Sequence, residues 1–133
     1  MPVYEFIAPA GSATFEPRAE IAAAVTRVHS EITGAPPRYV HCAFAEAAPG
    51  SMFVGGEPST APRLMGLIRE GRSAELRGRL IHAIADAWSA ITGDAKDELA
   101  IFLREVPGAN CFEDGTILPE ASEDAGAISG GPG

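Results

Sequence analysis

Two stretches of the sequence, VTRVHSEITGAPPRYVHCAFAEAAPG at 25–50 and IADAWSAITGDAKDELAIFLREVPG at 84–108, follow one pattern. In each stretch an Ile-Thr-Gly tripeptide is followed by a polar turn, an apolar run and a Pro-Gly pair. The tripeptide begins at 32 in the first stretch and at 91 in the second, an offset of 91 − 32 = 59 residues. Repetition at such a spacing is typical of a duplicated supersecondary unit. The sequence therefore predicts two copies of one unit.

The first copy is predicted to form a strand, a helix and a second strand. The strands are expected at 3–8 and 39–46, and the helix is expected to open at Pro17 and to end at Gly34. Apolar residues inside the helix recur at spacings of four, three and four, which form one helical face: Ile21, Val25, Val28 and Ile32.

The second copy repeats this order. Strands are expected at 63–68 and 99–105, and between them a helix with Ser73 as its N-cap ends at Gly93. Its apolar face is formed by Leu76, Leu80, Ile84, Ala87 and Ile91. The predicted fold is α/β (α+β): a duplicated βαβ unit whose four-stranded sheet carries both helices on one face.

The remaining segments complete the predicted organisation. Short edge hairpins are expected at 48–56 and 111–119, and the repeats span about 2–48 and 62–107 of a single domain, 1–119. The residues 120–133 have little apolar content and are expected to form a flexible acidic tail. Because two helices cover only one face of the sheet, the other face is predicted to pack against further copies of the chain in a homo-oligomer.

Composition excludes several classes of partner. The net charge is −8, which disfavours nucleic acid and acidic membranes as partners. No run approaches the roughly 18 apolar residues of a membrane span, and a cytoplasmic protein is expected. Cys42 and Cys111 are expected to be reduced packing residues. No metal or cofactor is predicted, since the histidines lack metal-ligand spacing: His29, His41 and His82.

Pro2 follows Met1, and removal of Met1 would leave a secondary amine as the chain terminus. An α-amino group titrates near about pH 8 in model peptides, and burial or neighbouring cations lower its pKa further. Such an amine can act as a base in catalysis. A proline at position two is also common without any function, so other residues must support the functional interpretation.

Arg69 and Arg72 lie between the second predicted repeat's first strand and its helix. Loop amides and a helix N-terminus already favour an anion there, and two guanidinium groups can converge on one carboxylate. The alternative is a pair of solvated surface arginines. The corresponding turn of the first copy, 8–15, contains no arginine, which fits a site at one end only.

His29 and Glu113 are further candidates. His29 lies beside the apolar face of the first predicted helix, and its counterpart at 29 + 59 = 88 is Trp88. A histidine in this position is either a half-buried structural side chain or a functional one. Glu113 is either an ordinary turn carboxylate of the second hairpin or a functional acid.

In combination, four segments resemble the tautomerase superfamily, and most closely its cis-3-chloroacrylic acid dehalogenase group. The segments are MPVY at 1–4, VHSEITG at 28–34, LIREGRSAEL at 67–76 and EVPGANCFEDGTILPE at 105–120. The resemblance extends from Pro2 to about Pro119. It implies a duplicated βαβ fold and a homotrimer, with the amino-terminal proline at the base of a pocket near a subunit boundary.

The resemblance also implies roles for individual residues. Pro2 corresponds to the catalytic amine, and Arg69 and Arg72 correspond to a clamp on the substrate carboxylate. His29 is similar to a residue that hydrogen-bonds this carboxylate or a carbonyl oxygen, and Glu113 to the carboxylate that activates a water molecule. Phe102 stands where the dehalogenase has a tyrosine, so the hydroxyl group is missing here.

The function expected from these residues is proton transfer on a small 2-keto (enol) or unsaturated carboxylic acid, with weak cis-3-chloroacrylate dehalogenase or hydratase capacity. Whether Pro2 is neutral or protonated depends on whether the arginines or Glu113 dominate its surroundings. Two alternatives stay open. One is a regulatory module that binds a small carboxylate without catalysis, and the other is a decarboxylase of 3-oxo acids.

Overall fold

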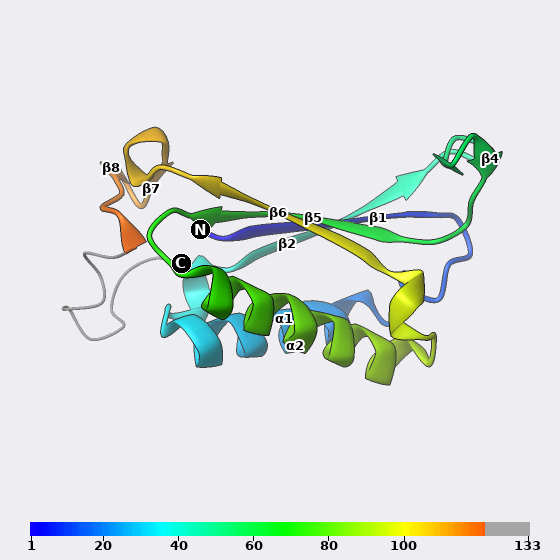
Figure 1. Ribbon diagram of the computed structural model, residues 1–133, viewed down its shortest axis with the longest axis horizontal. Helices are drawn as coiled ribbons and strands as arrows, with labels where there is room; N and C mark the ends of the chain where they lie inside the picture. The colour runs from blue at the N-terminus through cyan, green and yellow to red at the C-terminus, as the bar shows by residue number, and fades with distance from the viewer. Residues whose placement is uncertain (122–133) are drawn as a thin grey trace.

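Two βαβ units share one four-stranded sheet in the computed structural model, which describes residues 1–121 (Figure 1). The first unit consists of β1 (Val3–Pro9), α1 (Arg18–Thr33) and β2 (His41–Ala47), and the second of β5 (Arg63–Arg69), α2 (Ala74–Thr92) and β6 (Ala100–Val106). The strand order is β2-β1-β5-β6; β1 is parallel to β2, β5 is parallel to β6, and β1 is antiparallel to β5. The predicted duplicated βαβ fold is confirmed.

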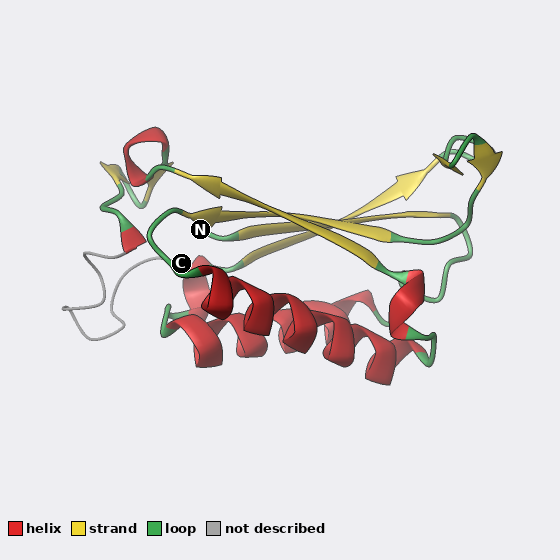
Figure 2. Cartoon of the chain, in the orientation of Figure 1, coloured by secondary structure: helices red, strands yellow, loops and turns green. Residues whose placement is uncertain are grey.

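Both helices lie on the same face of the sheet, as predicted (Figure 2). The core between the layers consists mainly of apolar side chains, and its large, fully buried members include Tyr4, Phe6, Ile21, Leu80, Ile84 and Trp88. Among residues 1–121, no helix covers the opposite face of the sheet (Figure 2). Met65 and Phe102 alternate with the more buried positions of β5 and β6 and are exposed on that face. An uncovered face with exposed apolar side chains is the feature from which an oligomer was expected.

The helix ends match the predicted signals. The Ser73 hydroxyl accepts a hydrogen bond from the backbone N–H of Leu76 at 3.1 Å and so caps α2. Gly34 and Gly93 end the two helices with φ angles of 79° and 80°, a left-handed conformation that costs glycine little. Pro17 occupies the N-cap position of α1.

Two hairpins lie at opposite ends of the sheet (Figure 1). One consists of β3 (Phe53–Val54) and β4 (Glu57–Pro58), and the other of β7 (Phe112–Glu113) and β8 (Thr116–Ile117). The described residues also contain three 3-10 turns: η1 (Pro37–Tyr39), η2 (Lys96–Glu98) and η3 (Gly108–Asn110). The hairpins are confirmed, and each is a separate two-stranded sheet. The turn η1 delays β2, which begins at His41 and not at residue 39 as predicted.

The predicted tail begins with two residues that contact the domain. The Glu120 carboxylate accepts a hydrogen bond from the Gly108 N–H at 2.7 Å, and the Ala121 N–H donates to the Glu70 carbonyl at 3.0 Å. The rest of that prediction, 122–133, lies outside the described residues. Within 1–121, neither helix has the length and apolar character needed to cross a membrane.

Candidate active site

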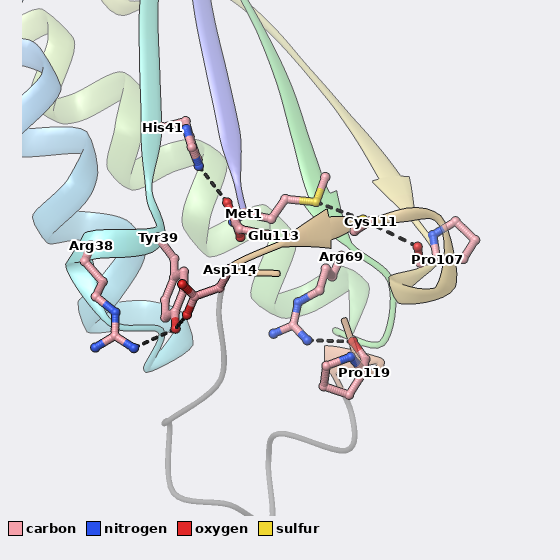
Figure 3. A network of polar contacts seen from close by, with 10 residues as sticks. All are labelled: Met1, Arg38, Tyr39, His41, Arg69, Pro107, Cys111, Glu113, Asp114 and Pro119. Atoms are coloured by element: carbon pink, nitrogen blue, oxygen red, sulfur yellow. Dashed lines mark hydrogen bonds and ion pairs between the residues drawn. The ribbon is translucent and has the colours of Figure 1, made fainter. Parts of the chain in front are cut away.

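The amino terminus and the β7–β8 hairpin meet at one end of the sheet (Figures 1 and 3). The Met1 ammonium group donates a hydrogen bond to Glu113 Oε1, and the Met1 sulfur lies 3.2 Å from the Cys111 thiol. Pro2 is buried, and its carbonyl accepts a hydrogen bond from the His41 N–H at 3.0 Å. The Met1 amine stands one residue ahead of the amine that Pro2 would carry after processing.

The Glu113 carboxylate is held at both oxygens. While Oε1 accepts from the terminal amine, Oε2 lies 2.6 Å from His41 Nε2. Burial alone would raise the pKa of Glu113, but hydrogen bonds from the amine and from His41 hold this pKa below its usual value. Glu113 is therefore ionised at neutral pH.

The terminal amine has its pKa lowered, because burial penalises its charged form. The hydrogen bond to Glu113 and its negative charge raise the pKa, and the positive charge of Arg69 lowers it. Burial prevails in this balance. The site therefore favours the neutral amine more than an exposed chain terminus does.

Arg69 and Arg72 are not freely solvated side chains. Arg69 ends β5, is fully buried, and donates from Nη1 to the Pro119 carbonyl at 2.6 Å (Figure 3). Arg72 is half-buried in the loop before α2, where its carbonyl accepts a hydrogen bond from Arg77 Nη1 at 2.6 Å. Burial lowers the pKa of both guanidinium groups, and the charge of Arg69 lowers the pKa of Arg72 further. The two positive charges therefore lie close together.

His29 is fully buried on α1, and its Nδ1 lies 2.8 Å from the Tyr4 hydroxyl. Burial lowers the pKa of His29 to about 3, and the positive charges of Arg72, the amino terminus and Arg69 contribute to this shift. Its imidazole is neutral at neutral pH. Within the part of the chain that the structure describes, Nε2 has no hydrogen-bond partner. A neutral ring with one nitrogen available is suited to bind a polar substrate atom.

Tyr4 reaches His29 because the adjacent strand leaves room for its ring. Gly66 is paired with Tyr4 across β1 and β5, and a Cβ atom at Gly66 would lie 3.1 Å from the Tyr4 ring and 2.6 Å from Leu103 Cδ2. A side chain at position 66 would therefore displace Tyr4, and with it the hydrogen bond that orients His29.

Five of the six predicted site residues thus converge: Pro2, His29, Arg69, Arg72 and Glu113. Phe102 does not. It is 55% exposed on β6 and lines a cavity of about 390 Å³ with Phe53 and Val54, toward the other end of the sheet. The amino terminus and Glu113 line a different cavity, of about 330 Å³.

Sequence reasoning missed His41 and Tyr4. His41 is at the start of β2, and only the folded chain brings it to Glu113, which is 113 − 41 = 72 residues away. The repeat offered the one signal for His41. Its counterpart at 41 + 59 = 100 is Ala100, so the polar residue occurs in the first copy and not in the second. Within 1–121, no group of three or more His, Cys, Asp or Glu side chains is placed to hold a metal ion.

The geometry agrees with the comparisons to known proteins. The family described as "Putative oxalocrotonate tautomerase enzyme" matches residues 1–128. The chain belongs to this tautomerase family. No curated protein matches its sequence. Family membership makes the chain a tautomerase-like enzyme, and it confirms the resemblance found in the sequence.

Solved structures of similar proteins support the same assignment. Native Ps01740 is 32% identical with a TM-score of 0.78, covering 84% of this chain and 99% of that one. N1, a member of the cis-3-chloroacrylic acid dehalogenase family, is 26% identical with a TM-score of 0.83, and the match covers 94% of this chain and 89% of N1. Pt0534, solved after inactivation by 2-oxo-3-pentynoate, is 26% identical with a TM-score of 0.73, and the match covers 91% of this chain and 97% of Pt0534. This tautomerase-family chain is therefore close in fold to the dehalogenase group.

Proposed function

We propose that this tautomerase-family chain, after loss of Met1, uses the Pro2 amine to move a proton between oxygen and carbon of a small 2-keto acid. The observation that carries the proposal is the burial of the amino terminus against Glu113, within the electrostatic reach of Arg69 and His29. Three chemically distinct groups that lie far apart in the sequence surround one amine.

In the proposed tautomerisation, the neutral Pro2 nitrogen accepts the proton of the enol hydroxyl, and the resulting ammonium delivers it to the neighbouring carbon. Arg69 and Arg72 bind the substrate carboxylate and stabilise the developing enolate charge. The neutral imidazole of His29 donates a hydrogen bond to the carboxylate or the carbonyl oxygen. The lowered pKa of the terminal amine supports the base role, since a larger fraction of the amine is then unprotonated.

Weak hydration or dehalogenation of cis-3-chloroacrylate is a second proposed capacity. It requires a protonated Pro2 as the acid and an ionised Glu113 as the base for water, and the pKa of Glu113 is held low. Phe102 lacks the hydroxyl that a tyrosine would offer to this water, and one hydrogen bond is worth about 0.5–1.5 kcal/mol. We therefore rank hydration below tautomerisation.

A homotrimer is part of this proposal. Phe102 lies away from the amino terminus of its own chain, so it can only contribute to the substrate site from a neighbouring copy. The uncovered sheet face, with Met65 and Phe102 exposed, offers apolar area for such an assembly. In a trimer, Phe102 would favour substrates with an apolar or aryl substituent.

The experiment compares the processed wild type with Pro2→Ala and with a form that retains Met1, using phenylenolpyruvate and cis-3-chloroacrylate. Pro2→Ala replaces the rigid secondary amine by a primary amine, and retention of Met1 moves the terminal amine by one residue. Either change should lower kcat/KM by about 10²–10⁴-fold, the contribution of a well-placed general base. Pro49→Ala, at an exposed turn, is the matched control and should keep wild-type rates.

Equal turnover by wild type and Pro2→Ala would remove the proposed mechanism. Absence of turnover in both, together with binding of a small carboxylate, would favour the regulatory module. Release of carbon dioxide from a 3-oxo acid by the wild type alone would favour the decarboxylase.

A further inference from the structure

His41 contacts the Glu113 carboxylate, which also accepts a hydrogen bond from the chain terminus. Its Nε2 lies 2.6 Å from Glu113 Oε2, while the terminal amine donates to Oε1 (Figure 3). The carboxylate is therefore held between β1 and β2 by two nitrogen groups that approach different oxygens. His41 is accessible, with 58% of its side chain exposed, whereas the Glu113 side chain is 20% exposed.

The position of His41 does not depend on Met1. Its backbone N–H donates to the Pro2 carbonyl at 3.0 Å, and the register of β1 with β2 pairs it with Val3. These contacts belong to Pro2 and to the residue after it. His41 therefore stays beside the chain terminus when Pro2 becomes the first residue.

A separate set of contacts holds the hairpin itself. The Tyr39 hydroxyl donates to Asp114 Oδ2 at 3.0 Å, and Arg38 Nη2 donates to the Tyr39 hydroxyl at 2.6 Å. The hairpin is thus attached to η1 without any contribution from His41. Removing the His41 side chain should release the Glu113 carboxylate while the backbone that carries it stays in place.

The other half of the repeat lacks both partners. The counterpart of His41 is Ala100, and the counterpart of Glu113 at 113 − 59 = 54 is Val54. The two polar residues occur together at the end of the sheet that carries the amino terminus, and the equivalent positions at the other end are both apolar.

We propose that His41 is a positioning residue, which holds the Glu113 carboxylate in place beside the Pro2 amine. The inference rests on the second capacity of the proposed function, the hydration of an unsaturated acid, in which Glu113 is the base for water. By donating to Oε2, His41 stops the carboxylate from rotating away from the amine, so that Glu113 stays oriented for the water that it would deprotonate.

The charged surroundings of Glu113 support this assignment. The charged or titratable groups that interact with Glu113 come from several neighbouring segments. They are the terminal amine before β1, His41 of β2, Arg69 of β5 and Cys111 before β7. The amine and His41 lower the pKa of Glu113, against the effect of burial. A carboxylate that loses one hydrogen-bond donor becomes easier to protonate.

The test uses the processed chain and the variants His41→Leu and His41→Gln. In His41→Leu, carbon-13 NMR titration should show the Glu113 pKa raised by about one pH unit, the effect of one hydrogen bond to a charged group. For cis-3-chloroacrylate, kcat should fall about tenfold while KM stays nearly constant. The acid limb of the kcat profile should move to higher pH. His41→Gln retains an N–H donor, so it should restore part of both effects.

His82→Leu, at an exposed position of α2, is the matched control and should leave the Glu113 titration unchanged. In a Glu113→Gln background, His41→Leu should cause no further loss of kcat. An unaltered Glu113 pKa in His41→Leu, or kcat losses that multiply in the double variant, would overturn the inference. The NMR titration of Glu113 does not require turnover. It therefore tests the role of His41 even if the Pro2→Ala experiment contradicts the proposed function.

Discussion

The two ends of the sheet have the same backbone design and different chemistry. At one end the Pro2 carbonyl accepts a hydrogen bond from the His41 N–H at 3.0 Å, and at the other the Pro62 carbonyl accepts from the Ala100 N–H at 3.5 Å. Each proline thus stands before the first strand of its unit. Pro62 is inside the chain and has no amine, whereas Pro2 can become a terminus. Backbone symmetry therefore does not extend to reactivity.

The helices show the same contrast at the positions 29 and 88. Trp88 is fully buried, and its indole N–H donates to the Thr14 hydroxyl at 3.1 Å, in the turn between β1 and α1. His29 is equally buried, and the charges of Arg72 and Arg69, from the turn between β5 and α2, act on it. One end is closed by a large apolar ring with a satisfied donor. The other keeps a ring nitrogen and two guanidinium groups together.

This comparison teaches how a duplicated fold can separate stability from function. At the paired positions compared above, such as 29 and 88, one residue is apolar and packs in the protein, and its counterpart is polar and belongs to the candidate site. The following three variants test that division, beginning with the largest expected effect.

Trp88→Ala should lower the free energy of unfolding by about 3–5 kcal/mol, because it leaves a large cavity and an unsatisfied Thr14 contact. Urea denaturation measures this change. At temperatures where the variant is folded, its kcat/KM should stay near that of the wild type. His82→Ala, on the exposed side of the same helix, is the control and should change stability by less than about 0.5 kcal/mol. A stable Trp88→Ala protein that has lost activity would contradict the division.

Arg72→Ala should lower kcat/KM for a 2-keto acid about 10–100-fold, since a hydrogen bond between charged groups is worth about 1.5–3 kcal/mol. Steady-state kinetics and a urea titration, taken together, separate this loss from unfolding. Arg79→Ala, at an exposed position of α2, should match the wild type. If both arginine variants lose activity equally, general electrostatic attraction and not a defined clamp explains substrate binding.

His29 should make the protein less stable in acid. Its folded pKa is lowered to about 3, while an unfolded histidine titrates near about 6.5. Between these two pKa values the unfolded chain binds this proton and the folded chain does not, so the free energy of unfolding decreases as the pH falls, by up to about 1.4 kcal/mol per pH unit. Above about pH 6.5 neither state binds the proton, and His29 does not affect the pH dependence.

His29→Gln should therefore flatten the dependence of stability on pH between about 6.5 and 4. Urea denaturation of wild type and variant across this pH range measures the difference between their free energies of unfolding. Carboxylates such as Glu113 are present in both proteins, so their contributions cancel in this difference. Parallel curves for the two proteins would show that His29 is protonated in the folded state.

Most of the fold could be predicted from the sequence because its signals are local. The apolar periodicity of Ile21 to Ile32, the capping hydroxyl of Ser73 and the glycines that end both helices act within a few residues. Repetition at an offset of 59 then related the two halves. The start of β2 was predicted two residues too early, because the 3-10 turn at Pro37–Tyr39 has no strong local signal.

The candidate site could be predicted in part. Pro2, His29, Arg69, Arg72 and Glu113 were found from the motifs that resemble the tautomerase superfamily, and the structure brings them together. Phe102 lies toward the end of the sheet that is opposite the amino terminus of the same chain. This placement could not be predicted from a motif, because a motif carries no information about which copy of the chain completes a site.

Local sequence thus determined the strands, the helices and the types of residue available for chemistry, because hydrogen-bonding periodicity and capping operate over a few residues. Only the tertiary structure determined that Arg69 is fully buried, that His29 is neutral and that His41 shares a carboxylate with the chain terminus. Burial and charge depend on neighbours that lie dozens of residues away in the sequence. Their effect on a pKa exists only after the sheet has brought those neighbours together.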